Sequence, residues 1–323
     1  MIEIGGVKQA VMVRGTNPDN PVLVYLHGGP GFPIFPIDQT KHHMESLEER
    51  YTIVYWEQRG TGKSFRPTIP TSSMKIDQFV EDTKQIIEYA QKELGVEKVF
   101  LWGHSWGTNI GALFASKYPE YLHAYISTGQ SVNPFKNERL GYEYVHYNAT
   151  KTGNKRALRQ LETIDTIPER YSLEDALLVR KWINKFGGIV QEIDKEKPYV
   201  ELNEIYMILS AVEYSVIDRI YLLLYPYYSA EKLWDDLKRF DLMKVAPQID
   251  VPVYFLIGSN DIIVSNVLAE QYFNKLSAPA GKELIWFEKS AHRPFFEEPE
   301  KFLNIMKNKI PNEVLHTDSI TAF

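Results

Sequence analysis

Residues 101–108 read Leu-Trp-Gly-His-Ser-Trp-Gly-Thr, and the five central residues match the pattern Gly-x-Ser-x-Gly. In this pattern a sharp turn between a strand and a helix lifts the serine hydroxyl clear of the backbone. The two flanking glycines, Gly103 and Gly107, have a steric role, since a Cβ on either would collide with neighbouring backbone. The stretch therefore indicates a nucleophilic serine at Ser105, provided that a strand precedes it and a helix follows it.

Both flanks of the pattern meet that condition. Residues 96–102 are β-branched and apolar and follow Gly95, which is typical of a buried strand. Residues 108–118 have a helical composition and stop just before Pro119. We therefore interpret Ser105 as the nucleophile of a strand–turn–helix elbow.

The rest of the chain predicts an α/β core with an insertion. Alternating strands and helices mean a parallel sheet with crossover helices. Strands are expected at 8–14, 21–26, 51–56, 96–102 and 124–127, with a helix at 74–94. Residues 131–245 contain mostly helix-like segments (155–164, 173–186 and 202–225), and strands resume at 251–257 and 283–287 before a final helix at 299–309. We interpret residues 1–130 and 246–323 as the core and 131–245 as a helical cap.

Composition excludes several classes of protein. The formal net charge of −6 and the pI near 5.8 argue against a nucleic-acid or anionic-membrane partner. The chain has no cysteine, which excludes disulfides and thiolate metal sites. Its first residues lack the features of a signal peptide, and no window approaches ~18 uninterrupted apolar residues. A cytoplasmic enzyme is expected, and its oligomeric state stays open.

A serine needs a base to take its proton and an acid to orient that base. Of the eight histidines, His292 stands out because it lies in a loop that follows a late strand, where the chain order Ser, acid, His would place the base. Asp261 follows the strand at 251–257 and falls at its carboxyl end, on the elbow's side of the sheet. Asp250 precedes the same strand and would lie at the opposite edge. We therefore choose Asp261 as the acid.

An oxyanion hole needs two backbone N–H groups that point at the developing negative charge. The residue after the nucleophile, Trp106, should supply one of them. The other should come from the glycine-rich run at 28–31, which directly follows the strand at 21–26. Such a run suits a loop that brings backbone close to a substrate. We take the N–H of Gly29 as the second donor.

These motifs together resemble a known family. The run His27-Gly28-Gly29-Pro30-Gly31, the segment Gln58-Arg59-Gly60-x-Gly62-x-Ser64 and the elbow, followed by Asp261 and His292, are similar to the proline iminopeptidase branch of the α/β-hydrolases. The resemblance spans essentially the whole chain. It implies an eight-stranded, mostly parallel sheet and a cap after the sixth strand. It also implies cofactor-free cleavage of small N-terminal residues by Ser105, Asp261 and His292, with no metal.

Two positions depart from the pattern of that branch. Its members usually read Gly-Gly-Ser-Trp-Gly at the elbow and Asp-Gln-Arg-Gly in the second segment, where this chain has His104 and Glu57. Neither change touches the triad, but both weaken an expectation of strict proline specificity.

Other functions stay open or are disfavoured. An esterase or lipase of small acyl esters could use the same triad and is the main alternative. A non-catalytic receptor of this fold is disfavoured because such proteins usually lose a triad member. A phosphate-binding loop that ends in Gly62-Lys63-Ser64 is disfavoured. The pattern Gly-x-x-x-x-Gly-Lys-Ser requires a glycine at position 57, where this chain has Glu57.

An aminopeptidase must also hold the substrate's ammonium, which requires a carboxylate from the cap. Glu213 is the one acid in the apolar segment 205–217. If that segment is helical, Glu213 shares a face with Tyr206, Leu209 and Ile217. We take Glu213 as the candidate. Glu204 and Glu143 are weaker candidates, because each has more polar neighbours.

Overall fold

The computed structural model describes residues 1–35, 42–189 and 210–320. An eight-stranded sheet runs through it in the order β1-β2-β4-β3-β5-β6-β7-β8. The pairs β1–β2 and β2–β4 are antiparallel, and every other neighbouring pair is parallel. The strands are β1 (Ile2–Ile4), β2 (Val7–Arg14), β3 (Val22–Leu26), β4 (Thr52–Glu57), β5 (Val99–His104), β6 (Leu122–Thr128), β7 (Val253–Gly258) and β8 (Lys282–Phe287). The predicted eight-stranded, mostly parallel sheet is confirmed, and among the strands in the described ranges the three-residue β1 is the one that the sequence patterns did not predict.

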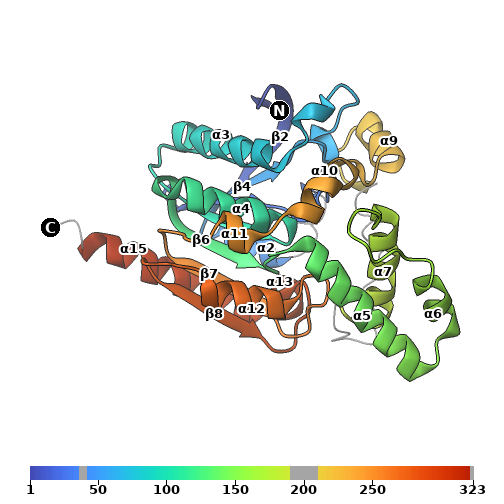
Figure 1. The fold of residues 1–323 in the computed structure, drawn as a ribbon. Helices are drawn as coiled ribbons and strands as arrows, with labels where there is room; N and C mark the ends of the chain where they lie inside the picture. The colour runs from blue at the N-terminus through green and yellow to red at the C-terminus, as the bar shows by residue number, and fades with distance from the viewer. Residues whose placement is uncertain (36–41, 190–209, 321–323) are drawn as a thin grey trace.

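Helices cover both faces of the sheet (Figure 1). The helices are α2 (His42–Glu48), α3 (Ile76–Leu94), α4 (Trp106–Lys117), α5 (Pro134–Thr152), α6 (Lys155–Leu161), α7 (Leu173–Lys185), α9 (Val216–Leu224), α10 (Tyr228–Arg239), α11 (Leu242–Val245), α12 (Asn266–Lys275), α13 (Pro294–Glu297), α14 (Pro299–Asn304) and α15 (Ile310–Ile320). None of the helices in the described ranges is long and apolar enough to cross a membrane.

Alternation along the central strands divides the core into two layers. Val22, Val24 and Leu26 of β3 point into a cluster with α3, α4 and α12. Leu23 and Tyr25 point into a second cluster with α2, α14 and α15 on the other face. Side chains alternate between the two faces of a strand, so each central strand of this sheet is buried on both sides.

The helices between β6 and β7 build a smaller core of their own. Side chains of α5, α6 and α7 form a third cluster that includes Val145, Leu161 and Trp182. In Figure 1 these three helices lie together beside the sheet. By contrast, Leu233 and Leu237 of α10 join the cluster of α3 and α4. The inserted helices therefore pack partly on one another and partly on the sheet layer.

The expected helix at 202–225 is wrong over part of its length. Residues 202–209 lie outside the described residues, but residues 211–215 are not helical and α9 begins only at Val216. Ser215 caps α9: its hydroxyl accepts from the Asp218 N–H at 3.3 Å, while the Asp218 carboxylate accepts from the Ser215 N–H at 3.0 Å. This Ser-x-x-Asp capping box was readable in the sequence.

The elbow depends on the absence of side chains at two glycines. A Cβ on Gly107 would collide with the carbonyl oxygen of Leu26, because α4 starts against the end of β3. A Cβ on Gly103 would come within 2.7 Å of the Gly107 carbonyl oxygen. The steric role expected of both glycines is confirmed.

We expect Gly107→Ala to destabilise the fold by roughly 3 kcal/mol or more, because backbone rather than a flexible side chain blocks the new methyl group. Urea unfolding measures this loss. Gly95→Ala is the control: a Cβ there meets nothing within 4 Å, so only its positive φ of 68° opposes the change, at a cost of about 1–2 kcal/mol. Equal losses in the two variants would contradict the proposed clash.

Candidate active site

Ser105 stands at the junction of β5 and α4 with φ 53° and ψ −119°. It is the one residue other than glycine with a positive φ in the described ranges. Its N–H donates to the carbonyl of Thr128 on β6 at 2.9 Å. A strained, non-glycine conformation of this kind persists only where the surrounding structure holds it. The elbow is therefore fixed by β3, β5 and β6 together.

His292 and Asp261 lie in hydrogen-bond contact. The Nδ1 of His292 is 2.8 Å from Oδ2 of Asp261, and both side chains are buried. A carboxylate only accepts hydrogen bonds, so Nδ1 carries the proton and Nε2 is left as the basic nitrogen. The other oxygen of Asp261 accepts from the Val264 N–H at 2.9 Å. The acid is thus oriented from one side while it orients the histidine from the other.

Two cavities meet at Ser105. One, of about 200 Å³, is lined by Ser105, His292, Gly28, Gly29 and Arg293 among others. The other, of about 50 Å³, is lined by Ser105, Trp106, Gly29 and several residues of the inserted helices. The residues expected from the sequence as nucleophile, base and oxyanion donors therefore line two cavities that have Ser105 and Gly29 in common. Among the described residues, no group of three or more His, Asp or Glu side chains could hold a metal.

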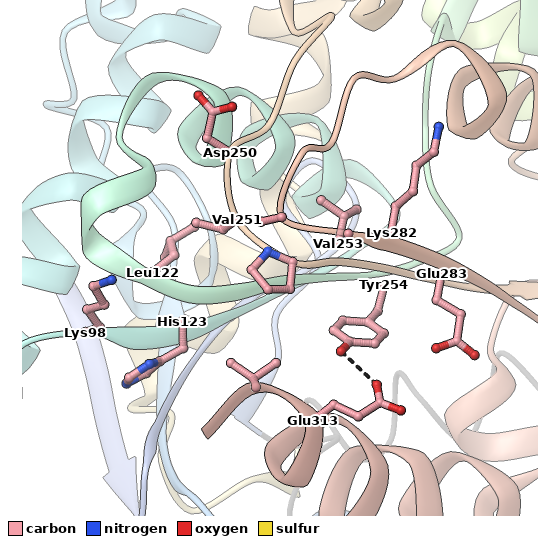
Figure 2. Close-up of a pocket in the computed structure, with 14 residues that line it drawn as sticks. Lys98, Leu122, His123, Asp250, Val251, Val253, Tyr254, Lys282, Glu283 and Glu313 are labelled. Carbon is pink, nitrogen blue, oxygen red and sulfur yellow. Dashed lines mark hydrogen bonds between the residues drawn. The ribbon is translucent and has the colours of Figure 1, made fainter. Parts of the chain in front are cut away.

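Asp250 lies far from this site. It lines a larger cavity, of about 600 Å³, at the amino ends of β6, β7 and β8 (Figure 2). Gln248 donates to its carboxylate at 2.7 Å. The expectation that Asp250 would lie at the opposite edge of the sheet from Asp261 is confirmed.

The two residues expected as oxyanion donors, Gly29 and Trp106, lie in two neighbouring backbone segments and both line the smaller cavity. Gly29 adopts φ 120°, which favours glycine, and a Cβ there would lie 2.5 Å from the Gly31 nitrogen. Trp106 is the first residue of α4, so its N–H is among the unpaired amides at a helix amino terminus, where negative charge is stabilised. The side chain of Gln58 joins the two segments: it donates to the His27 carbonyl at 3.1 Å and accepts from the Trp106 indole at 2.9 Å.

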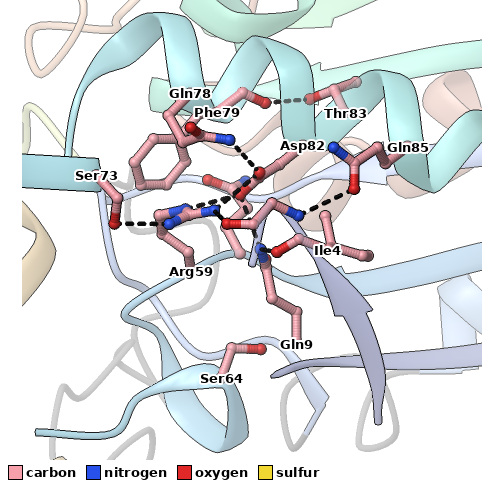
Figure 3. Close-up of polar contacts among 12 residues, drawn as sticks. Ile4, Gln9, Arg59, Ser64, Ser73, Gln78, Phe79, Asp82, Thr83 and Gln85 are labelled. Atoms are coloured by element: carbon pink, nitrogen blue, oxygen red, sulfur yellow. Dashed lines mark hydrogen bonds and ion pairs between the residues drawn. The ribbon is translucent and has the colours of Figure 1, made fainter. Parts of the chain in front are cut away.

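A buried ion pair anchors the segment that carries Gln58. The guanidinium of Arg59 makes a bidentate contact with Asp82 of α3, at 2.8 and 2.9 Å, and both side chains have no solvent exposure. Figure 3 shows the pair among further polar contacts, with Ser73 accepting from Arg59 and Gln78 donating to Asp82. The Arg59 and Gln58 contacts together fix the loop after β4 relative to the oxyanion segments.

Two histidines near Ser105 are held neutral. Burial lowers the pKa of His27 to about 4. Its Nδ1–H donates to the Gly28 carbonyl and its Nε2 accepts from the Gln58 N–H. The pKa of His104 falls well below its usual value because of burial and the nearby charges of His292 and Arg293. Neither residue competes with His292 as a base.

Glu213 does not line either of the two cavities at Ser105. It lies in the turn before α9, where its carbonyl accepts from Lys63 at 2.5 Å. The expected shared helical face with Ile217 is wrong, since Ile217 belongs to α9 and Glu213 does not. Tyr206, Leu209 and Glu204 lie outside the described residues, and Glu143 of α5 is exposed.

A different acid from the inserted helices reaches the site. Glu138 of α5 is buried and lines the smaller cavity with Ser105. It accepts from Arg180 of α7 at 2.6 Å and from the Tyr171 hydroxyl at 3.3 Å. Sequence reasoning missed both Glu138 and Arg180, because neither stands in a motif and only the packing of α5 on α7 brings them together at Ser105.

Comparisons with known proteins identify the family of the chain. A family model described as the alpha/beta hydrolase fold matches residues 21–299. The chain belongs to the α/β-hydrolase family. The probable aminopeptidase YbaC of Bacillus subtilis (strain 168) is 32% identical to it over 307 residues, with 94% of this chain and 93% of the relative covered. A proline iminopeptidase of Heyndrickxia coagulans is 25% identical over 314 residues, with coverage of 94% and 96%.

Solved structures share the fold at lower identity. VinJ superposes with a TM-score of 0.67 at 18% identity, and the alignment covers 96% of each chain. The proline iminopeptidase of Mycobacterium smegmatis gives 0.66 at 15% identity and covers 98% of each. The resemblance to the proline iminopeptidase branch is confirmed, and this α/β-hydrolase is a hydrolytic enzyme.

Glu57, one of the two residues that depart from the branch pattern, has a raised pKa. It is fully buried, and burial raises its pKa to about 7 although the Tyr214 hydroxyl and the Lys63 N–H donate to it. The folded state therefore holds a proton on Glu57 more tightly than the unfolded chain, where the pKa is near 4.5. The stabilisation from this proton is complete below that value and is lost as the pH rises through about 7.

We expect Glu57→Gln, which mimics the protonated acid, to gain stability relative to the wild-type enzyme as the pH rises from about 5 to about 8. Chemical denaturation across this range measures the difference. Glu93→Gln, at an exposed position of α3, is the control and should show no such trend. A wild-type stability that rose in parallel with that of Glu57→Gln would rule out the raised pKa.

Proposed function

We propose that this hydrolase removes a small N-terminal residue, proline or a similar one, from short peptides or amides through an acyl-enzyme on Ser105. The observation that carries the proposal is the hydrogen bond of His292 to Asp261 beside a cavity that Ser105 also lines. The names of the relatives, aminopeptidase and proline iminopeptidase, support the peptide chemistry.

The proposed reaction uses one proton carrier and one anion site. Ser105 Oγ attacks the scissile carbonyl while Nε2 of His292 takes its proton, and Asp261 stabilises the imidazolium that forms. The N–H groups of Gly29 and Trp106 would hold the oxyanion. The histidine then gives its proton to the leaving amine. A water molecule, activated by the same base, releases the acyl group and restores Ser105.

We further propose that residues 131–245 act as the cap that sets specificity. An aminopeptidase must place a carboxylate near the substrate's ammonium. Glu138 fits this role, since it is buried and borders the same cavity as Ser105. Glu213, the acid singled out from the sequence, remains the second candidate and serves as a comparison in the test.

We expect Ser105→Ala and Asp261→Asn each to lower kcat on a prolyl 4-nitroanilide by at least about 10³-fold with the fold intact. A fluorophosphonate probe should label Ser105 in the wild-type enzyme and leave Ser105→Ala unlabelled. Asp250→Asn is the matched control and should keep full activity, because it lies at the opposite edge of the sheet. Labelling of another residue, or retained turnover in Ser105→Ala, would remove Ser105 from the mechanism.

We expect Glu138→Gln to raise KM for free-amine prolyl and alanyl amides by roughly 10-fold to 100-fold, the value of a charge-assisted hydrogen bond. Turnover of short acyl esters should stay the same, because an ester has no ammonium to hold. Steady-state kinetics on free-amine, N-blocked and ester substrates provide the measurement. If Glu213→Gln shows this pattern instead, Glu213 is the anchor. Equal losses on both substrate types, or efficient cleavage of esters alone, would favour an esterase.

A further inference from the structure

The larger cavity at Ser105 carries positive charge. Two arginines, Arg180 and Arg293, are among the residues that line it, and no aspartate or glutamate is among them in the described part of the chain. The two histidines in the lining do not reverse this balance, since His104 is held neutral and His292 is the base. The charged groups in this lining therefore favour an anion over an ammonium group.

The ion pair with Glu138 uses only part of the donor capacity of Arg180. Its Nη2 bonds to Glu138 at 2.6 Å, but its Nε is buried with no hydrogen-bond partner among the described residues. The side chain as a whole is 34% exposed, and it borders both cavities at Ser105. A guanidinium has five N–H donors in a planar fork that matches a carboxylate, so one ion pair does not exhaust it.

Arg293 adds a second positive charge to the same wall. It directly follows His292, and its guanidinium lies 5.5 Å from the ring centroid of Phe32, which also lines the cavity. The nearby carboxylate of Glu297 accepts from the backbone N–H groups of Ala291 and Arg293, at 3.0 and 3.1 Å. The loop after β8 therefore supplies both the proposed base and a cation beside it.

We propose that Arg180, assisted by Arg293, binds a free carboxylate on the leaving group, so that dipeptides are the preferred substrates. This inference rests on the proposed function. In a dipeptide the carboxylate is separated from the scissile nitrogen by a single Cα, so it lies close to the bond that Ser105 attacks. The larger cavity at Ser105 has a volume of only about 200 Å³, which also suits a short leaving group.

Each charged end of a dipeptide has an oppositely charged side chain near Ser105. Glu138 borders the smaller cavity and Arg180 borders both, with Ser105 common to the two. A dipeptide zwitterion places its ammonium toward Glu138 and its carboxylate toward Arg180, with the scissile carbonyl between them. The ion pair of Glu138 with Arg180 keeps both side chains in place when no substrate is bound.

The test compares prolylglycine with prolylglycinamide, which differ only in the carboxylate. We expect the wild-type enzyme to cleave the acid with a kcat/KM at least about tenfold higher, mainly through KM, since the carboxylate is bound equally in the ground and transition states. Arg180→Gln should bring the two substrates to within about twofold of each other, while any loss that comes from releasing Glu138 should lower cleavage of both by the same factor. A residue with a purely structural role would lower both activities and leave their ratio as in the wild-type enzyme.

Three further variants complete the design. Arg180→Lys retains the charge and should keep part of the preference for the acid. Arg170→Gln, which removes an exposed arginine paired with Asp165 before α7, should leave the preference intact. Arg293→Gln should reduce the preference as well, and it replaces Arg180→Gln as the deciding variant if that protein does not fold.

The outcomes separate the inference from the proposed function. Equal cleavage of the two peptides by the wild-type enzyme, or a preference that survives in both arginine variants, overturns the carboxylate site and leaves the aminopeptidase standing. Cleavage of short acyl esters with neither peptide cleaved overturns the proposed function, and the carboxylate site falls with it. A preference that is present in the wild-type enzyme and lost in Arg180→Gln supports both.

Discussion

The close approach of α4 to the end of β3 is the constraint on which the site depends. Gly107 touches the Leu26 carbonyl, and this contact fixes where the helix starts. Ser105 joins β5 to this helix and has a positive φ of 53°, the conformation expected where a sharp elbow presents the serine hydroxyl. The glycine loop that follows Leu26 is thereby held next to Trp106. The close approach of these two elements thus brings together Ser105 and the two segments that hold the expected oxyanion donors.

A second set of polar contacts holds the two segments with the expected oxyanion donors in place. The buried pair of Arg59 with Asp82 anchors the loop after β4, and Gln58 in that loop bonds to both oxyanion segments. A buried ion pair adds little net stability compared with apolar packing, but breaking it leaves an uncompensated charge. In this protein the ion pair fixes the loop that carries Gln58, so that the Gln58 side chain lies between His27 and Trp106.

The sheet and the inserted helices contribute different groups to the site: the sheet carries the proposed triad, and the helices carry charged side chains. The residues of the proposed triad come from the carboxyl ends of the sheet, at the tips of β5, β7 and β8, whereas Glu138 and Arg180 come from α5 and α7. The helices that carry these two charges have their own apolar cluster. Charge recognition can therefore change with the inserted helices while the reaction machinery on the sheet stays the same.

The sequence by itself determined the sheet, the elbow and the residues expected to react. Local signals sufficed for these, because glycine spacing, strand periodicity and chain order act within a few residues or follow from the winding of a parallel sheet. Ser105, Asp261 and His292 were predicted in this way. Only the tertiary structure decided which charges from the inserted helices meet Ser105. Glu138 and Arg180 lie on different helices and carry no motif, and the turn that removes Glu213 from a helix is set by a cap at Ser215. Contacts between helices distant in sequence depend on packing of the whole chain, which no local pattern encodes.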